Sequence, residues 1–243
     1  MIRTAKGRAT RRWFGDWANE YDATLGKVRR HHQLLNLAVR CSGVRRGDRV
    51  LDVGCGTGLL SLKFLKRAAC HVTAVDSSPD MLRLFRGKID ALGLHSRVTC
   101  LRQDAAGLRF PRDAFDVVAA TVALHHVEDK LPMLRRTRAI LKPGGRLVIG
   151  EVDCDTSGDP ADPKRLARIL DFLKAEILMA LKEGGVPGFS RMYDNGKKHI
   201  LSQGEYCLSS RQWKALCLKA GFRRATVHAL PGFRWFKVVV AVR

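Results

Sequence analysis

The sequence predicts an α/β fold in which a mostly parallel central sheet carries helices on both of its faces. Short apolar runs alternate along the chain with segments whose apolar residues recur at helical spacing, and this alternation is typical of parallel sheets. The chain has 243 residues, of which 46% are hydrophobic, enough for one α/β domain with a complete core. No apolar run reaches the ~18 residues that a membrane-spanning helix needs, so we expect no transmembrane segment.

The first predicted strand leads into a turn that is rich in glycine. Residues 48–54 (DRVLDVG) form a short apolar run bounded by Asp and Gly, which is typical of a buried strand. The segment GCGTG follows at residues 54–58, and residues 58–69 have helical spacing. Glycine lets the backbone turn sharply and approach a ligand without a Cβ atom in the way. A strand, a glycine turn and a helix together predict a nucleotide-binding element.

The next two units repeat this pattern and add acids at the strand ends. Residues 71–78 and 97–105 are predicted strands, and the helix between them, residues 79–94, begins with Pro and Asp. Ligands of open parallel sheets bind at the carboxyl ends of the strands. We therefore expect three acids to gather on one rim of the sheet: Asp52, Asp76 and Asp104.

The last units of the predicted sheet are two further strands with a helix between them. Residues 115–124 (FDVVAATVAL) form the fourth strand. A helix over residues 131–145 is stopped by Pro-Gly-Gly, and residues 146–153 (RLVIGEVD) form the fifth strand. Strands joined by helices in this way are expected to run parallel, because the helix returns the chain to the end of the sheet at which the previous strand began.

The glycine motif alone leaves two cofactors open. Residues 54–58 begin like the dinucleotide pattern GxGxxG, but its sixth position is Leu59, where NAD sites prefer Gly or Ala for close helix packing. A phosphate-loop site is disfavoured because no Lys-Ser/Thr pair follows. Asp76 lies about twenty residues further on, where an acid accepts hydrogen bonds from ribose hydroxyls. That acid suits either NAD or S-adenosyl-L-methionine (SAM).

Five segments in a fixed order resolve this choice through a family resemblance. Together they resemble the class I SAM-dependent methyltransferases, and most closely the ubiquinone/menaquinone-biosynthesis-like (type 11) branch, over about residues 17–152. The segments FGDWANEYD and LSSRQWKALCLKAGF look like the N-terminal helix of that branch and its late helix before a closing hairpin. The resemblance implies a Rossmann-like class I methyltransferase fold with a small helical lid. The five segments are VLDVGCGTG, VTAVDSSPDML, RQDAAGLRF, FDVVAATVALHHVED and LKPGGRLVIGEV.

The resemblance also implies a division of the chain into four parts. Residues 1–45 would hold a basic segment and helices that close over the cofactor. Residues 46–152 would be the SAM-binding core, and residues 153–206 an insertion that covers the substrate. Residues 207–243 would add a C-terminal helix and the closing strands of the core.

The methionine and ribose parts of SAM have their own expected contacts. By resemblance, the backbone at Gly54, Cys55 and Gly56 approaches the methionine part. Asp52 would hold the turn and its surroundings through hydrogen bonds. Asp76 matches the acid that binds both ribose hydroxyls, since a carboxylate makes charge-assisted bonds to two donors. For each of these acids the structural alternative is that it only caps the next helix.

The adenine ring and the N-terminal closure are assigned in the same way. Ser77 and Met81 match positions where the ring packs, and Asp104 matches the acid near the adenine amino group, with the Ala105 amide beside it. Tyr21 resembles a tyrosine that closes over the cofactor.

The end of the fourth strand is expected to face the reacting methyl group. Ala120 and Thr121 would lie at the methionine end of SAM. His125 and His126 follow, where the acceptor of related enzymes meets the methyl group. Because imidazole titrates near neutral pH, either histidine can act as a general base for a hydroxyl or a protonated amine. The alternative is that they only shape the loop. Glu151 and Asp153, which are expected to follow the fifth strand on the same rim, are further candidates.

No metal site is predicted, and the seven cysteines have neither CxxC pairs nor metal-ligand spacing. An odd, scattered set of cysteines favours reduced thiols, so we expect a cytoplasmic protein. The insertion at residues 153–206 includes a predicted amphipathic helix at residues 164–185, for which core packing is the simpler use. Four residues of this insertion are candidate substrate contacts: Arg191, Tyr193, His199 and Tyr206.

The chain is strongly basic, with a formal net charge of +21. Residues 1–50 carry 12 Lys/Arg and 4 Asp/Glu, and residues 197–243 carry 10 and 1, so the excess lies on the flanks. Such charge favours anionic partners, although it can also serve solubility alone.

Three functions follow from these observations. The first is a SAM-dependent methyltransferase for a small or lipid-like acceptor. The positive charge of the protein is compatible with an anionic acceptor. The second is a methyltransferase acting on RNA or another nucleic acid. The third is a SAM-binding protein without catalysis. The acceptor atom and the oligomeric state are not predicted.

Overall fold

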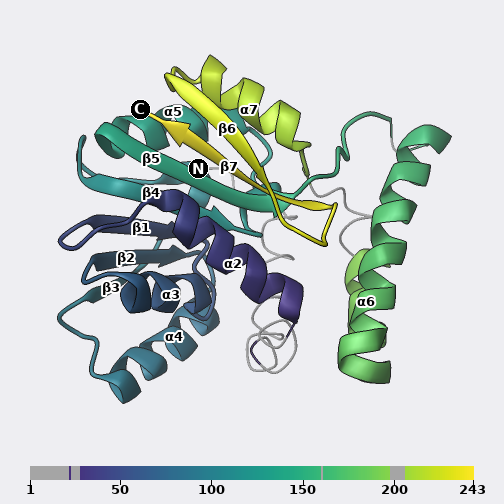
Figure 1. Ribbon diagram of the computed structural model, residues 1–243, viewed down its shortest axis with the longest axis horizontal. Coiled ribbons are helices and arrows are strands. Elements are labelled where there is room, and N and C mark those ends of the chain that lie inside the picture. Colours follow the sequence, from purple (N-terminus) through teal and green to yellow (C-terminus); the bar gives the residue numbers. More distant parts are fainter. Residues whose placement is uncertain (1–21, 23–27, 160, 198–205) are drawn as a thin grey trace.

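A seven-stranded sheet forms the centre of the molecule. The computed structural model describes residues 22, 28–159, 161–197 and 206–243. The strands lie in the order β3-β2-β1-β4-β5-β7-β6, and the first five are parallel. This confirms the predicted α/β class with a mostly parallel sheet (Figure 1). The strands are β1 (Arg49–Val53), β2 (His71–Asp76), β3 (Val98–Arg102), β4 (Phe115–Thr121), β5 (Leu141–Val152), β6 (Arg224–Ala229) and β7 (Phe236–Val242).

The strand order reverses at β1. From β1 the chain adds β2 and β3 on one side, then returns to place β4 and β5 on the other. In open α/β sheets, ligands bind outside the carboxyl ends of the strands at such a switch point. The carboxyl ends of β1 and β4 are therefore the expected place for a site. The chain then closes with a hairpin, in which β7 runs antiparallel to both β5 and β6.

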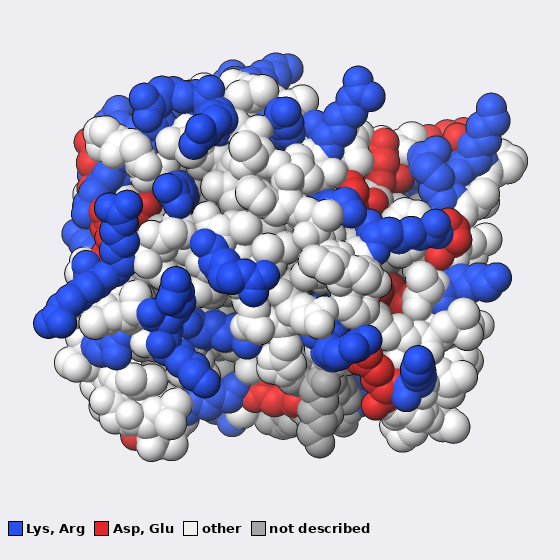
Figure 2. All heavy atoms as spheres, viewed as in Figure 1, with Lys and Arg blue, Asp and Glu red and all other residues white. Residues whose placement is uncertain are grey.

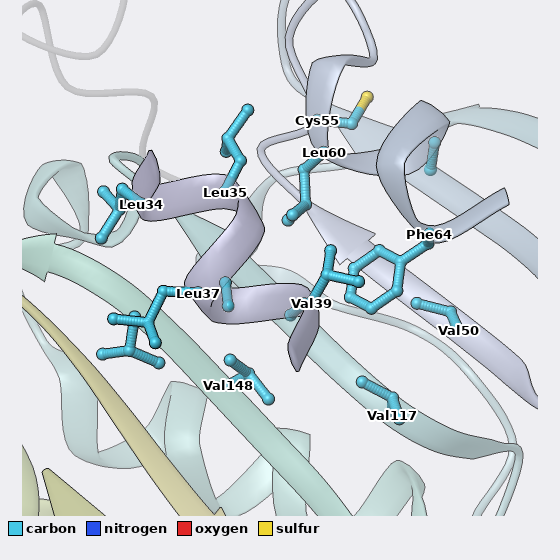
Figure 3. Close-up of a cluster of buried hydrophobic side chains, with 14 of the residues drawn as sticks. Leu34, Leu35, Leu37, Val39, Val50, Cys55, Leu60, Phe64, Val117 and Val148 are labelled. Carbon is cyan, nitrogen blue, oxygen red and sulfur yellow. The ribbon is translucent and has the colours of Figure 1, made fainter. Parts of the chain in front are cut away.

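Helices cover both faces of this sheet (Figure 1). On one face, side chains of α2 (Arg29–Ser42), α3 (Leu59–Arg67) and α4 (Pro79–Leu92) pack with strand residues in one hydrophobic cluster, part of which is drawn in Figure 3. On the other face, α5 (Lys130–Ile140) and α7 (Ser210–Lys219) contribute to a second cluster.

Neighbouring strand residues divide between these two clusters. Val50 and Val117 belong to the first cluster, whereas the next residues, Leu51 and Val118, belong to the second. Successive side chains of a strand point to opposite faces, so both faces of these strands are buried. This is why the central strands are apolar runs rather than alternating patterns.

One long helix, α6 (Pro163–Asn195), stands at the side of the sheet (Figure 1). A buried ion pair joins it to α2, with 2.6 Å between Arg30 Nη2 and Glu176 Oε2. Its inner face adds Ile169, Phe172 and Leu173 to the first cluster. None of the helices in the described ranges is long and apolar enough to span a bilayer.

Several element boundaries differ from the sequence prediction. The fourth strand ends at Thr121 rather than residue 124, because Val122 has a left-handed backbone (φ 50°) that breaks the extended run. The helix predicted over residues 131–145 is α5, which ends at Ile140, since the chain continues as β5 from Leu141, which pairs with Phe115.

The predicted helix at residues 164–185 corresponds to the first part of α6, which continues to Asn195. Gly185 adopts non-helical angles (φ 62°, ψ −156°) and Pro187 follows, so α6 consists of two helical parts separated by a kink.

Candidate active site

The glycine turn after β1 has a backbone that only glycine adopts readily. Gly54, Gly56 and Gly58 have φ values of 70°, 53° and 87°, all in the left-handed region. A Cβ atom on Gly54 would lie 2.5 Å from the Cβ of Ala123, and one on Gly58 would lie 2.1 Å from the Phe85 ring. These two glycines therefore allow the turn to pack against the loop after β4 and against α4.

Gly56 differs from its neighbours because space opens next to it. A Cβ atom on Gly56 would meet no atom within 4 Å. The Gly54 and Cys55 amides donate to the Val75 carbonyl oxygen at 2.8 and 3.0 Å, so the turn is attached to the end of β2. A fixed backbone beside open space fits the close approach of a ligand such as SAM.

Asp76 ends β2 and faces this turn. Its Oδ2 accepts a hydrogen bond from the Gly56 amide at 2.8 Å, and its Oδ1 accepts one from the Ser78 amide at 2.8 Å. Removal from water raises the pKa of Asp76, although these amide hydrogen bonds oppose the shift. Each carboxylate oxygen has a second lone pair, so Asp76 can still accept ribose hydroxyls. The hydrogen-bond acceptors of Asp76 therefore fit the ribose of SAM.

Asp52 lies inside the protein rather than on the rim. It is only 1% exposed, and its Oδ2 accepts a 2.6 Å hydrogen bond from Ser61 Oγ of α3. Burial raises its pKa to about 7, an effect that the Ser61 hydrogen bond partly offsets. Asp52 therefore joins β1 to the helix that follows the turn.

The expected adenine contacts lie at the ends of β2 and β3. Ser78 caps α4, where its hydroxyl accepts from the Met81 amide at 3.3 Å, and the Met81 side chain is buried. Asp104 is exposed and accepts from the Ala106 amide at 3.0 Å, so it also caps a short helical turn. Its charge contributes to the raised pKa of Asp76, which places the two acids near one another. Ser77 and Ala105 are both half-buried beside them.

One group of contacts at the turn was not predicted from the sequence. Asp22 Oδ1 accepts from Thr57 Oγ1 at 2.6 Å, and Asp22 Oδ2 lies 2.5 Å from Lys88 Nζ. The same ammonium group donates to the Thr57 carbonyl oxygen at 2.8 Å. A residue of the N-terminal segment therefore contacts the glycine turn directly. Tyr21 lies outside the described residues.

The loop after β4, residues 122–129, contains His125 and His126 and is named the histidine loop. Ala120 is buried in β4, and Thr121 is half-buried at its end. Val122 has a φ of 50°, which is strained for a β-branched residue. His125 is buried and His126 is half-buried, with ring centroids 4.1 Å apart.

A buried carboxylate holds this loop. Glu151 lies within β5, not after it, and its Oε1 accepts from the amides of Ala123 at 2.8 Å and Leu124 at 2.7 Å. Its Oε2 is 2.9 Å from His125 Nδ1. Burial alone would raise the pKa of Glu151, but His125 and the two amides lower it below its usual value. Glu151 is therefore an ionised acceptor.

The three candidate substrate contacts that the structure describes lie on two segments of the chain. Tyr206 lies near the histidine loop, since its amide donates to the His125 carbonyl oxygen at 2.9 Å. Arg191 and Tyr193 lie on α6 beyond the kink, where Tyr193 stacks on Phe189 with 6.0 Å between ring centroids. His199 is not among the described residues.

The described ranges contain no cluster of three potential metal ligands. All seven cysteines are free thiols in the structure.

Comparisons with known proteins agree with this arrangement. A family model described as "Methyltransferase domain" matches residues 50–145. A Pasteurella multocida protein named ubiquinone/menaquinone biosynthesis C-methyltransferase UbiE is 34% identical over 177 residues, which cover 68% of this chain and 64% of that protein. The UbiE protein of Vibrio campbellii is 39% identical over 123 residues, which cover 50% of this chain and 48% of that protein.

The chain carries a class I SAM-dependent methyltransferase domain. Its cofactor is SAM. The predicted methyltransferase fold and cofactor are thereby confirmed, and the chain is similar to the UbiE proteins. The chain spans about half to two thirds of the length of these relatives.

Solved structures show the same fold. A SAM-dependent methyltransferase from Aquifex aeolicus has a TM-score of 0.60 at 16% identity, with 96% of this chain and 97% of that chain covered. An S-adenosylmethionine-dependent methyltransferase from Mesorhizobium loti has a TM-score of 0.58 at 20% identity, with 85% and 96% covered. The sheet described above is thus a Rossmann-like methyltransferase sheet.

Proposed function

We propose that this chain catalyses C-methylation of a small, lipid-like aromatic acceptor of the quinol type, with SAM as the methyl donor. The names of the relatives from P. multocida and V. campbellii support this acceptor class. The observation that carries the proposal is the junction between two loops. The glycine turn packs on Ala123 of the histidine loop and hydrogen-bonds to Asp76, so the residues that we propose for SAM binding lie next to the loop that carries the proposed base.

The residues around the turn would bind the cofactor. Asp76 would accept hydrogen bonds from the ribose hydroxyls, and the backbone at Gly54–Gly56 would approach the methionine part. Ser77, Met81, Asp104 and Ala105 would surround the adenine ring. SAM supplies an electrophilic methyl group on a sulfonium centre, so the protein needs mainly to orient the acceptor and exclude water.

The histidine loop would handle the proton. A phenolic hydroxyl that loses its proton donates electron density to the ring, and this makes the neighbouring ring carbon a better nucleophile. His125 or His126 would accept that proton, since imidazole titrates near neutral pH. The ring carbon would then take the methyl group, and the electron pair of the broken carbon–sulfur bond would stay on sulfur. A base would remove the ring proton from the methylated carbon, and the histidine would return its proton to the phenolic oxygen, so that each cycle releases one proton.

The direct test is methyl transfer from CD3-labelled SAM to a polyprenylated naphthoquinol that lacks the ring methyl group. We expect one CD3 group on a ring carbon, detected by mass spectrometry and NMR. A matched naphthoquinol that already carries the ring methyl group is the control. SAM binding without transfer to any acceptor would instead support the non-catalytic alternative.

A separate measurement tests the cofactor site. Asp76→Ala removes a charge-assisted acceptor worth roughly 1.5–3 kcal/mol, so SAM affinity should fall about 10- to 100-fold. Isothermal titration calorimetry measures this change. Asp90→Ala is a matched control, because Asp90 is an exposed acid of α4 that pairs with His95 at 3.4 Å, away from the glycine turn. Equal affinities in the two variants would remove Asp76 from the site.

A further inference from the structure

Within the part of the chain that the structure describes, the Glu151 carboxylate makes its hydrogen bonds to one short loop. The carboxylate lies in β5 and is 4% exposed. Two consecutive amides, those of Ala123 and Leu124, donate to Oε1 at 2.8 and 2.7 Å. The ring of His125 approaches Oε2 at 2.9 Å through Nδ1. A single buried side chain therefore sets the position of the backbone and of the imidazole together.

The chemistry of this contact determines where the imidazole proton lies. An ionised carboxylate is only an acceptor, so the atom that faces it must carry hydrogen. The pKa of Glu151 is held below its usual value, which keeps it ionised near neutral pH. Nδ1 of His125 must then carry a proton. In neutral His125, the lone pair that accepts a proton is consequently on Nε2.

Hydrogen bonds from β5 also fix the backbone at the start of the loop. Val122, immediately before it, has a left-handed φ of 50°. Its amide donates to the Gly150 carbonyl oxygen at 2.8 Å, one residue before Glu151. Backbone strain of this kind persists only where surrounding contacts impose it, and it concentrates at functional sites. The edge formed by Gly150 and Glu151 supplies these contacts to three successive residues of the loop.

We propose that Glu151 is a positioning residue for methyl transfer. It holds His125 in the tautomer with hydrogen on Nδ1 and so presents Nε2 as the proton acceptor. This inference rests on the proposed function, in which the histidine loop takes a proton from the acceptor. Among the described residues, the titratable groups near this pair include Lys130 of α5, whose pKa Glu151 affects, and Tyr206, whose amide donates to the His125 carbonyl oxygen. They also include His126, whose ring is tilted against that of His125.

The test is Glu151→Gln, which keeps the shape of the side chain. Its amide oxygen can still accept from the two loop amides, and its NH2 group then faces His125 Nδ1. That donor demands the opposite tautomer, with hydrogen on Nε2. We expect SAM affinity within about twofold of wild type and a kcat lower by ~10²–10⁴, the usual loss when a general base is removed. We expect no compensating change in KM.

Nitrogen NMR provides a readout that a merely structural role would not move. In the 15N-histidine spectrum, assigned through His125→Gln, the wild-type signal should show the proton on Nδ1, and the Glu151→Gln signal should show it on Nε2. Asp116→Asn is the matched control, because this carboxylate lies at the other end of β4 and pairs with Lys142 at 2.7 Å. The control should change neither kcat nor the His125 signal.

The outcomes separate this inference from the proposed function. Wild-type His125 with hydrogen on Nε2 would overturn the positioning role, and this spectrum needs no variant that might fail to fold. Normal kcat in Glu151→Gln, with His125→Ala inactive, would also overturn it while leaving the proposed function intact. Absence of methyl transfer by the wild type would refute the proposed function alone, because the tautomer exchange would remain measurable.

Discussion

At the scale of single residues, Asp52 is an acid whose burial should make stability depend on pH. Its pKa is about 7 in the folded protein, whereas the unperturbed value is 3.8. Because the folded state binds this proton more tightly, its contribution is fully present below pH ~4 and is lost as the pH rises through 7. Within that window the expected slope is up to ~1.4 kcal/mol per pH unit.

Asp52→Asn should remove this part of the pH dependence. The asparagine oxygen can still accept from Ser61 Oγ, while the buried charge disappears. We expect the variant to gain stability relative to wild type as the pH is raised from 5 to 8. Urea unfolding at several pH values in this range measures the difference. A constant difference across the range would show that Asp52 does not titrate there.

At the scale of secondary-structure elements, Gly58 determines how closely α3 and α4 pack. It is the residue before α3, with a φ of 87°, and a Cβ atom there would lie 2.1 Å from the Phe85 ring. Gly58→Ala should therefore destabilise the protein, by roughly 1–3 kcal/mol for the backbone conformation alone. Displacement of a buried ring should add to this loss.

Gly87→Ala is the matched control for this prediction. Gly87 lies within α4, and a Cβ atom there would have no atom within 4 Å. Alanine has the higher helix propensity, so this variant should gain about 0.5–1 kcal/mol. Thermal unfolding of both variants shows the contrast. Equal effects of the two substitutions would contradict the packing role of Gly58.

At the scale of the whole molecule, the strong positive charge does not gather in one patch on the face seen in Figure 2. Lys and Arg side chains are scattered over that face, and acids accompany them near α6. We therefore expect the charge to act as a general field on small anions rather than as a nucleic-acid binding surface.

Salt dependence tests this expectation. For a small acceptor, kcat/KM should change only a few-fold between 50 and 200 mM salt. A nucleic-acid acceptor contacted through 6–10 phosphates would lose ~10³–10⁵ in affinity over the same range. Binding to a generic RNA alone would not establish that alternative, because any chain this basic binds RNA nonspecifically. Methyl transfer to the RNA would be required to refute our expectation.

Much of the core could be predicted from the sequence because its signals are local. An apolar run between turn residues is enough to indicate a buried strand, and the glycine turn with Asp76 twenty residues later indicates a cofactor site. Element ends were less predictable. The early end of β4 depends on the left-handed backbone of Val122. Valine rarely adopts this conformation, so the residue type does not predict it.

By itself, the sequence determined the fold class and the order of the core strands and helices along the chain, because both depend on local periodicity and turn residues. It indicated the cofactor only through the resemblance of five ordered segments to a known family. The tertiary structure alone decided which side chains meet. Glu151 and His125 are 26 residues apart and Asp22 and Thr57 are 35 apart, yet each pair is in hydrogen-bond contact. Such contacts arise when the sheet places β5 beside β4 and the N-terminal segment beside the turn. No local pattern encodes them, because they depend on the packing of the entire chain.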